Sequence, residues 1–350
     1  MKNLIVVFLL FVILLVPKTT YSSHAAGLDI TYECISANQY RVILTFYREC
    51  GGVNAPSGNW SGYLEVFSPS NGSTVGLNLT ETTPFPVPVF PTISSSPSCP
   101  YTGSCSGGTT NQTEEYTYEG ILNLPSQRAD WTILAAIYAR NPGITTVNNA
   151  ANYDLCIRAV INNTTSVGCN SSPVWNYDPP SYLCVSSNNT YSTSATDTDG
   201  DSIVYSMVNP MNNWNGFGYS AVVNNVPYNG GYSFTSPLSG VTTFDQITGN
   251  MSFSPTQQQT TIWAVKAEEY RNGALIGSIS RDIQTTSLVC NSNPPNLTGI
   301  DTLALADVNT NAFYFCANGN AVMTFDINAL TSPPNGTNNI TMSYSGIPSG

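Results

Sequence analysis

Apolar and polar residues alternate along most of the chain from residue 28 onward. The segments 40–47, 131–139 and 153–161 show the alternation most clearly, and the second reads Trp-x-Ile-x-Ala-x-Ile-x-Ala. A period of two places every second side chain on the same face of a half-buried strand. The pattern therefore predicts an all-β protein, in which we expect no helix longer than two turns.

Turn residues separate the alternating segments. Asn38 divides two of them, which predicts a hairpin at this point. Asn272-Gly273 also lies between two strand-like runs and is typical of a type I′ hairpin turn. The proline-rich segment 84–91 cannot donate a full ladder of hydrogen bonds. We expect it to form an edge strand or an extended crossover.

The first 22 residues are typical of a secretory signal peptide. Lys2 precedes an unbroken apolar run from residue 4 to residue 16, which is shorter than the roughly 20 residues that a membrane span needs. We predict cleavage after Ser22 and export of the mature chain. No later segment is apolar enough to span a bilayer.

The chain repeats itself weakly. Cys169-Asn-Ser-Ser-Pro recurs as Cys290-Asn-Ser-Asn-Pro, and the spacing from Cys184 to Asn188 recurs from Cys316 to Asn320. Repetition at this period indicates tandem β-sandwich modules. We expect one module over 23–168, a second over 169–290, and the start of an incomplete one over 291–350, as in a fragment of a longer protein.

Composition and charge exclude several classes of protein. The chain has 350 residues with a net charge of −11, which argues against a nucleic-acid partner. Charged residues are only 9% of the chain, too few for a protein built from surface helices. The single histidine, His24, lies at the start of the mature chain, so zinc sites with two imidazoles and Ser-His-Asp catalysis are not expected.

Nine cysteines suit an oxidising compartment, and none forms a Cys-x-x-Cys pair. If the hairpin turns near Asn38, Cys34 lies opposite Val42 and too far from Cys50 for a disulfide. Two schemes remain open for the second module. Cys184–Cys290 would leave an odd cysteine, whereas the favoured scheme closes short loops at both module junctions. The candidates for disulfides are Cys50, Cys99, Cys105, Cys169, Cys184, Cys290 and Cys316, and the favoured pairs are Cys169–Cys184 and Cys290–Cys316.

Asp197, Asp199 and Asp201 place three carboxylates within five residues. Carboxylates on alternate residues of a tight loop can converge on Ca²⁺, so calcium is the cofactor that the sequence indicates. The spacing does not fit an EF-hand. Glu268 and Glu269 could add ligands if their strand ends nearby. The alternative is an Asp-Gly turn whose carboxylates cap backbone N–H groups.

Trp214, Phe217 and Tyr219 lie in a loop rich in glycine and asparagine. Exposed aromatic side chains on loops can stack on a sugar or anchor a protein partner. The alternative is that they fold back as a small core of their own. Arg48-Glu49 and Arg281-Asp282 pair opposite charges at the ends of predicted strands. They could form a binding patch, but cross-strand ion pairs or solvated edge charges explain them more simply.

Several motifs together resemble a known family. They are SHAAGLDITYECISANQYRVILTFYRECGG, YTYEGILNLP, DWTILAAIYARN, NSSPVW and EYRNGALIGSISRDIQ, which lie between residues 23 and 300. They resemble gliding-motility-associated, adhesin-like surface proteins of Bacteroidota. SATDTDGDSIVYS and FDQITGNMSFSP are similar to cadherin-like and immunoglobulin-like repeats of bacterial surface proteins. The resemblance implies immunoglobulin- or cadherin-like sandwiches and export by type IX secretion machinery.

The sequence thus predicts a secreted, non-catalytic adhesion or stalk protein of a bacterial cell surface. Its partner would be a cell-surface glycan or protein ligand, bound by many weak contacts along the array. Carboxylates are plentiful, but no two stand in a context typical of a glycosidase pair. The alternative is a set of accessory modules of a secreted hydrolase whose catalytic domain lies beyond residue 350.

Overall fold

A computed structural model describes residues 25–49, 54–83, 113–180, 182–216 and 218–289, with short strands at 87–88, 296–298, 304–307, 312–315 and 328–330. This part of the chain is all-β, as the alternation predicts, and its one helical element is a 3-10 turn over Ala150–Asn152. None of its helices is long and apolar enough to cross a membrane. The predicted signal peptide and five of the cysteines (50, 99, 105, 290 and 316) lie outside the described residues.

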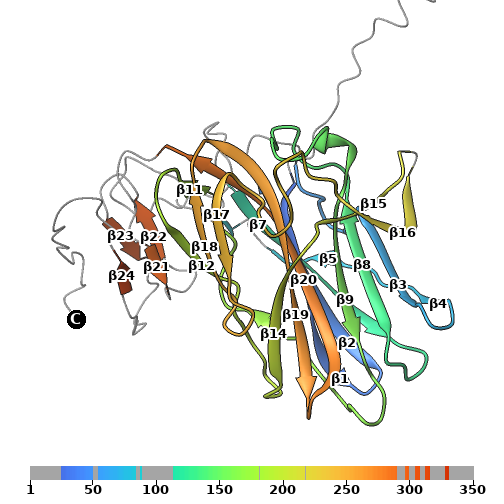
Figure 1. The fold of residues 1–350 in the computed structure, drawn as a ribbon. Helices are drawn as coiled ribbons and strands as arrows, with labels where there is room; N and C mark the ends of the chain where they lie inside the picture. Colours follow the sequence, from blue (N-terminus) through green and yellow to red (C-terminus); the bar gives the residue numbers. More distant parts are fainter. Residues whose placement is uncertain are drawn as a thin grey trace, which may run out of the picture.

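The longest strand, β20 (Ala274–Leu288), crosses the middle of the molecule in Figure 1. Its partner along nearly its whole length is β19 (Gln259–Arg271). Asn272 and Gly273 join the two strands, both with positive φ, as the type I′ turn requires. The hairpin that Asn272-Gly273 predicts is therefore confirmed.

The other edge of β20 is shared by three strands in succession. Its start pairs with β9 (Leu155–Ile161), its middle with β1 (Ala25–Ser36), and its end with the parallel strand β11 (Tyr182–Cys184). Strands from distant parts of the sequence therefore pair with the same edge of β20. Ten further strands complete the 15-stranded sheet: β2 (Gln39–Glu49), β3 (Tyr63–Ser68), β4 (Ser73–Val75), β5 (Thr80–Glu81), β6 (Val87–Pro88), β7 (Thr113–Asn123), β8 (Trp131–Ile137), β14 (Ser202–Val208), β15 (Met211–Trp214) and β16 (Tyr219–Asn225).

The sheet divides at β20 into two wings. One wing continues from β9 through β8 and β3 to β4, and the other from β1 through β2 and β7 to β5. Apolar side chains from both wings belong to one buried cluster, because each wing alone would leave an apolar face in water. This shared core includes Leu28, Ile30, Leu44, Tyr118, Ile133, Ile157, Trp263 and Ile279.

Smaller sheets accompany the large one. Strands β12 (Asn189–Ser192), β18 (Asn250–Pro255) and β17 (Gly240–Phe244) form a three-stranded sheet. It lies on the side of β20 opposite to β8 and β3 in Figure 1. The remaining two-stranded pairs are β10 (Val174–Trp175) with β13 (Ala195–Thr196), β21 (Asn296–Thr298) with β24 (Asn328–Leu330), and β22 (Ala304–Asp307) with β23 (Ala312–Phe315).

The predicted boundary at residue 169 does not separate two sandwiches. Strand β20, from the predicted second module, lies between β9 and β1, from the predicted first module. The sequence pattern identifies strands but does not specify their partners, since any strand with an apolar face can pair with any other. Within the described residues, the ranges 25–168 and 169–289 share one sheet and one core.

Strand β8 also differs from the prediction of a half-buried strand. Its residues 131–136 are all buried, because one face meets the shared core and the other meets a second cluster. That cluster contains Leu134, Ala136 and Cys156, with Met211 and Val223 of the β15–β16 hairpin packed against it. The hairpin therefore covers a face that the alternating pattern had assigned to solvent.

Two adjacent charged residues in the middle of β20 form ion pairs in the protein interior. Arg281 contacts Asp29 of β1 through two nitrogens, at 2.9 and 2.6 Å, and Asp282 receives a bidentate bond from Arg140, at 2.9 and 2.6 Å. All four side chains are at most 5% exposed. Neighbouring residues of a strand point to opposite faces, so β20 is tied to a different partner on each face.

The interpretation of these charges as ion pairs across strands is confirmed, but their expected place at strand ends is wrong for β20. Arg48 likewise pairs with Glu114 of β7 at 2.8 Å, and both side chains are buried. Glu49 instead accepts hydrogen bonds from Asn141 and Gln284. Burial removes these charges from water, so each depends on its partner.

The disulfide pattern differs from the favoured scheme. Cys34 is bonded to Cys169, with Cα atoms 5.6 Å apart, so the predicted Cys169–Cys184 bond is wrong. Cys34 lies opposite Tyr40 rather than Val42, but the prediction that it does not pair with Cys50 is confirmed. The segment after Cys169 runs beside β1, which the local spacing of cysteines could not reveal. Cys156, buried in β9, is free.

Removing one partner of the ion pair between Arg140 and Asp282 should destabilise the protein strongly. We expect Asp282→Asn to lower the free energy of unfolding by about 3–5 kcal/mol, because the Arg140 charge stays buried without a counter-charge. The matched control is Glu268→Gln, which breaks the half-exposed pair with Lys266 and should cost less than about 1 kcal/mol. Urea unfolding measures both. Equal small losses would contradict a structural role for the buried pair.

Peptide mapping of the unreduced protein should recover a Cys34–Cys169 peptide. Cys184 is also disulfide-bonded, and the parallel pairing of β11 with β20 places it opposite Leu288. We therefore expect Cys184 to bond with Cys290, two residues further along. Cys156 should react with an alkylating reagent only after unfolding. A Cys169–Cys184 peptide would show that the segment after residue 168 is placed wrongly.

Candidate functional site

Three carboxyl groups meet where the loop before β14 approaches the end of β19. Oxygen atoms of Asp197, Asp201 and Glu269 all lie within 4.8 Å of one another. We call these three residues the carboxylate cluster. The loop supplies the first two and the strand supplies the third, so the structure brings together Asp197 and Asp201, which the sequence indicated, with one of the two glutamates it suggested.

The loop itself is an Asp-Gly turn. Oδ1 of Asp197 accepts the backbone N–H groups of Asp199 at 3.0 Å and of Asp201 at 2.8 Å. Gly200 has a φ of +84°, a conformation that glycine adopts without steric cost. Asp199 does not join the cluster, because its carboxylate accepts the N–H of Ser171 at 2.7 Å. The turn thus uses Oδ1 of Asp197, and Oδ2 takes no part in it.

Asp201 already has a cationic partner. Arg271 of β19 forms a bidentate ion pair with it, Nε to Oδ1 at 2.8 Å and Nη2 to Oδ2 at 2.5 Å. The same guanidinium donates to Oδ1 of Asn170 at 2.7 Å. The charge of Arg271 therefore compensates the charge of Asp201. The carboxyl groups of Asp197 and Glu269 need a proton or another cation.

Glu269 is fully buried, and burial raises the pKa of its carboxyl to about 9, with its contact to Asp197 adding to the shift. Its oxygens accept hydrogen bonds from Tyr32 at 3.3 Å and from Asn170 at 3.1 Å. Oδ2 of Asp197 is also buried and has no donor among the described residues. Two facing carboxyl groups can hydrogen-bond only if one holds a proton, so the pair must share a proton or a cation.

The donor set fits a hard cation. Ca²⁺ takes six to eight oxygen ligands, and the cluster offers carboxylate oxygens from two elements. Asp197, Asp201 and Glu269 would hold the ion, which would supply the positive charge that Glu269 otherwise takes as a proton. Space is tight on the strand side, since a Cβ on Gly277 would collide with the Glu269 carboxylate and the Tyr32 hydroxyl. Any bound ion must therefore sit on the loop side of Glu269.

The carboxylate cluster lies beside the Cys34–Cys169 bond. The segment after Cys169 is held against β1 by Ser172, which exchanges backbone and side-chain hydrogen bonds with Tyr32 at 2.8 and 2.9 Å. Asn170 in this segment contacts both Glu269 and Arg271. The disulfide, β1, the loop and β19 are thus tied together at one point.

Sequence reasoning missed several residues of this site. Tyr32, Asn170 and Arg271 complete it, but each comes from a different element and none carries a local signal for the side chains that it contacts. Glu268, the other suggested ligand, pairs with Lys266 at 2.7 Å and faces away, because neighbouring residues of a strand alternate.

The aromatic loop is described only in part. Trp214 stacks on Tyr138, with ring centroids 4.2 Å apart and planes at 26°, and Tyr138 remains 39% exposed. Trp214 and Tyr219 are opposite each other in the β15–β16 hairpin. Phe217 and the side chain of Tyr219 lie outside the described residues. The sequence did not single out Tyr138, which gives Trp214 an aromatic neighbour from another strand.

Calcium should stabilise the protein through the carboxylate cluster. If an ion binds the cluster, it binds only the folded state, so millimolar Ca²⁺ should raise the melting temperature, and Asp197→Asn or Glu269→Gln should abolish the increase. Asp199→Asn is the matched control in the same loop and should keep the response, since Asp199 faces Ser171. A wild-type melting curve that is unchanged by Ca²⁺ and EDTA would contradict calcium binding. It would indicate that a shared proton joins Asp197 and Glu269.

The same pair predicts a pH dependence in EDTA. The folded state holds a proton on Glu269 up to a pKa of about 9, whereas the unfolded state releases it near the ordinary value of 4.5. Stability from this group is therefore complete below the ordinary value and is lost as pH rises to about 9. Glu269→Gln should flatten the fall in melting temperature between these limits. Ca²⁺ should stabilise the wild type more at high pH, because it competes with the proton.

Comparison with family models and curated sequences identifies no relative. No protein-family model and no curated protein sequence matches the chain. The resemblance of its motifs to gliding-motility-associated surface proteins therefore stays a prediction, and the function has to be inferred from the residues and their geometry.

Proposed function

We propose that the chain is a secreted, non-catalytic adhesion or structural stalk protein of a bacterial cell surface, related to gliding-motility-associated proteins. The observation that supports this best is the continuity of the sheet through β20, which joins distant parts of the chain into one scaffold. A surface protein must hold its binding face at a fixed distance from the cell under load. A sheet tied by buried ion pairs suits that task, and disulfides suit an oxidising compartment.

Calcium would stiffen the same scaffold. The carboxylate cluster joins the loop before β14 to β19 and lies beside the Cys34–Cys169 bond, so an ion there would reinforce a junction that is already covalently held. The partner would be a cell-surface glycan or protein ligand, and the export route would be type IX secretion. Adhesion of this kind relies on many weak contacts. The stack of the exposed Tyr138 on the partly buried Trp214 is one surface that could contribute to them.

Immobilised protein should adhere without catalysing a reaction. Beads that carry residues 23–350 should stay on a surface of bacterial extracellular polysaccharide or cells under flow, and beads with reduced, unfolded protein should wash off. The soluble protein should not cleave a panel of glycans and peptides. Glu115, whose pKa burial raises to about 8, is the first carboxyl to test as a general acid. Turnover that Glu115→Gln abolishes would overturn the non-catalytic proposal in favour of an enzyme.

A further inference from the structure

Four buried side-chain atoms without a hydrogen-bond partner lie at the base of the β15–β16 hairpin. They are Nε of Arg140, Oδ2 of Asp154, and both Oδ1 and Nδ2 of Asn213. The three side chains are at most 1% exposed. We call these three residues the polar seam. A buried polar atom is costly unless it is hydrogen-bonded, so native proteins satisfy such atoms either internally or with ordered water.

Backbone contacts bring the residues of the polar seam together. Nη2 of Arg140 donates to the carbonyl of Met211 at 3.2 Å. Two residues further along β15, the backbone N–H of Asn213 donates to Oδ1 of Asp154 at 3.0 Å. The backbone N–H of Arg140 also donates to the carbonyl of Tyr153 at 2.9 Å, directly before Asp154. The guanidinium and the carboxylate therefore both lie against the short strand β15.

Asp154 is the second acidic neighbour of Arg140. The guanidinium already gives both Nη atoms to Asp282, at 2.9 and 2.6 Å. Burial raises the pKa of Asp154 to about 6, and the charge of Arg140 opposes the rise, so the carboxyl is mostly ionised at neutral pH. The remaining donor of the cation, Nε, and the remaining acceptor of the anion, Oδ2, both lack a partner within the described chain.

The unpartnered atoms define what can lie between them. The bound molecule must accept a hydrogen bond from Arg140 and donate one to Asp154, while the Asn213 amide can do both. A cation would lie beside Arg140 and an anion beside Asp154, and a buried like-charge contact is unfavourable. Water donates and accepts at once and is small enough for a closed site. We propose that the polar seam binds ordered water, which bridges Arg140 to Asp154 and to the Asn213 amide.

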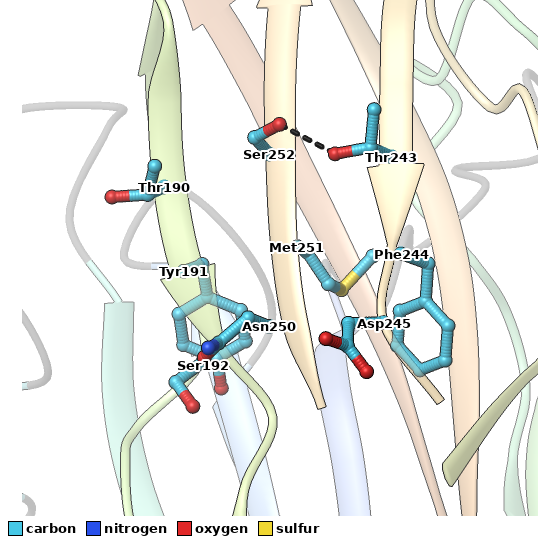
Figure 2. A pocket seen from close by; sticks show the side chains of 9 residues that line it. All are labelled: Thr190, Tyr191, Ser192, Thr243, Phe244, Asp245, Asn250, Met251 and Ser252. Carbon is cyan, nitrogen blue, oxygen red and sulfur yellow. Dashed lines mark hydrogen bonds between the residues drawn. The ribbon is translucent and has the colours of Figure 1, made fainter. Parts of the chain in front are cut away.

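The hollow on the three-stranded sheet β12–β18–β17 needs no such molecule. Figure 2 shows the Thr243 and Ser252 hydroxyls within it, and they bond to each other at 2.6 Å. Thr243, Asp245 and Asn250 are exposed, so bulk water reaches their side chains. The polar seam differs because its side chains are closed to solvent. A water molecule there has to be held at a fixed place.

The bridging water would join the β15–β16 hairpin to the ion pair of β20. Asn213 belongs to β15, whereas Arg140 is bonded to β20. Trp214, which stacks on Tyr138, directly follows Asn213, so the polar seam also supports the base of this aromatic stack. Buried water of this kind is part of a structure and is costly to remove. The water site goes beyond the proposed adhesive function and does not depend on it.

A crystal structure of the mature chain, residues 23–350, tests the proposal directly. At a resolution that shows ordered water, a density peak should lie within hydrogen-bond distance of Nε of Arg140 and Oδ2 of Asp154, with the Asn213 amide as a further partner. A direct bond between Arg140 and Asp154 would overturn the proposal. A polar seam without a density peak would overturn it as well.

Magnetic relaxation dispersion of the water ¹⁷O nucleus tests the same site in solution, because it detects water held inside a protein for longer than the protein tumbles. Asn213→Leu keeps a similar volume but removes both polar atoms, and should lose at least one long-lived water. The matched control is Asn250→Leu, which changes an exposed asparagine and should lose none. The crystal structure keeps the test decisive if Asn213→Leu fails to fold. An unchanged count in folded Asn213→Leu would contradict the proposal.

Discussion

The fold depends on two buried ion pairs that strand β20 forms with its neighbours. Arg281 and Asp282 are adjacent, buried and oppositely charged, and each must meet its counter-charge on a different face of the strand. A buried charge without a partner costs several kcal/mol, so β20 is stable only where Asp29 and Arg140 are both delivered to it. Those two residues come from β1 and from the segment after β8. The ion pairs therefore require that the N-terminal half of the described chain assemble around a strand from its C-terminal half.

The same assembly creates the carboxylate cluster. Beyond its pairing with β20, strand β1 continues to Tyr32 and Cys34, where the disulfide and the carboxylate cluster are built. The buried Arg281 also donates a hydrogen bond to the Tyr191 hydroxyl, which ties β12 of the three-stranded sheet to β20. The cluster thus stands on side chains whose positions are set by buried contacts of the large sheet. A site placed on a rigid scaffold can bind without first ordering its own residues, which lowers the cost of binding.

The sequence predicts the elements of this fold better than their partners. Alternation locates β2, β8 and β9, and Asn272-Gly273 locates the hairpin of β19 and β20, because these signals depend only on neighbouring residues. The partner of Cys34 and the place of β20 between β9 and β1 depend on contacts between distant segments, which no local pattern encodes. In the candidate site, too, local motifs can be predicted but contacts between distant segments cannot. Asp197 and Asp201 are visible as a motif, whereas Tyr32 and Asn170 join the cluster only once the strands have assembled.

Hydrogen exchange across a series of denaturant concentrations tests the central claim that β20 unites the described chain into one structural unit. The amides of β1, β9, β19 and β20 should open together, with a single free energy equal to that of global unfolding. Amides of β1 and β9 that stay protected after β19 and β20 have exchanged, or the reverse, would contradict the claim. That result would show two sandwiches that unfold independently, divided near residue 169.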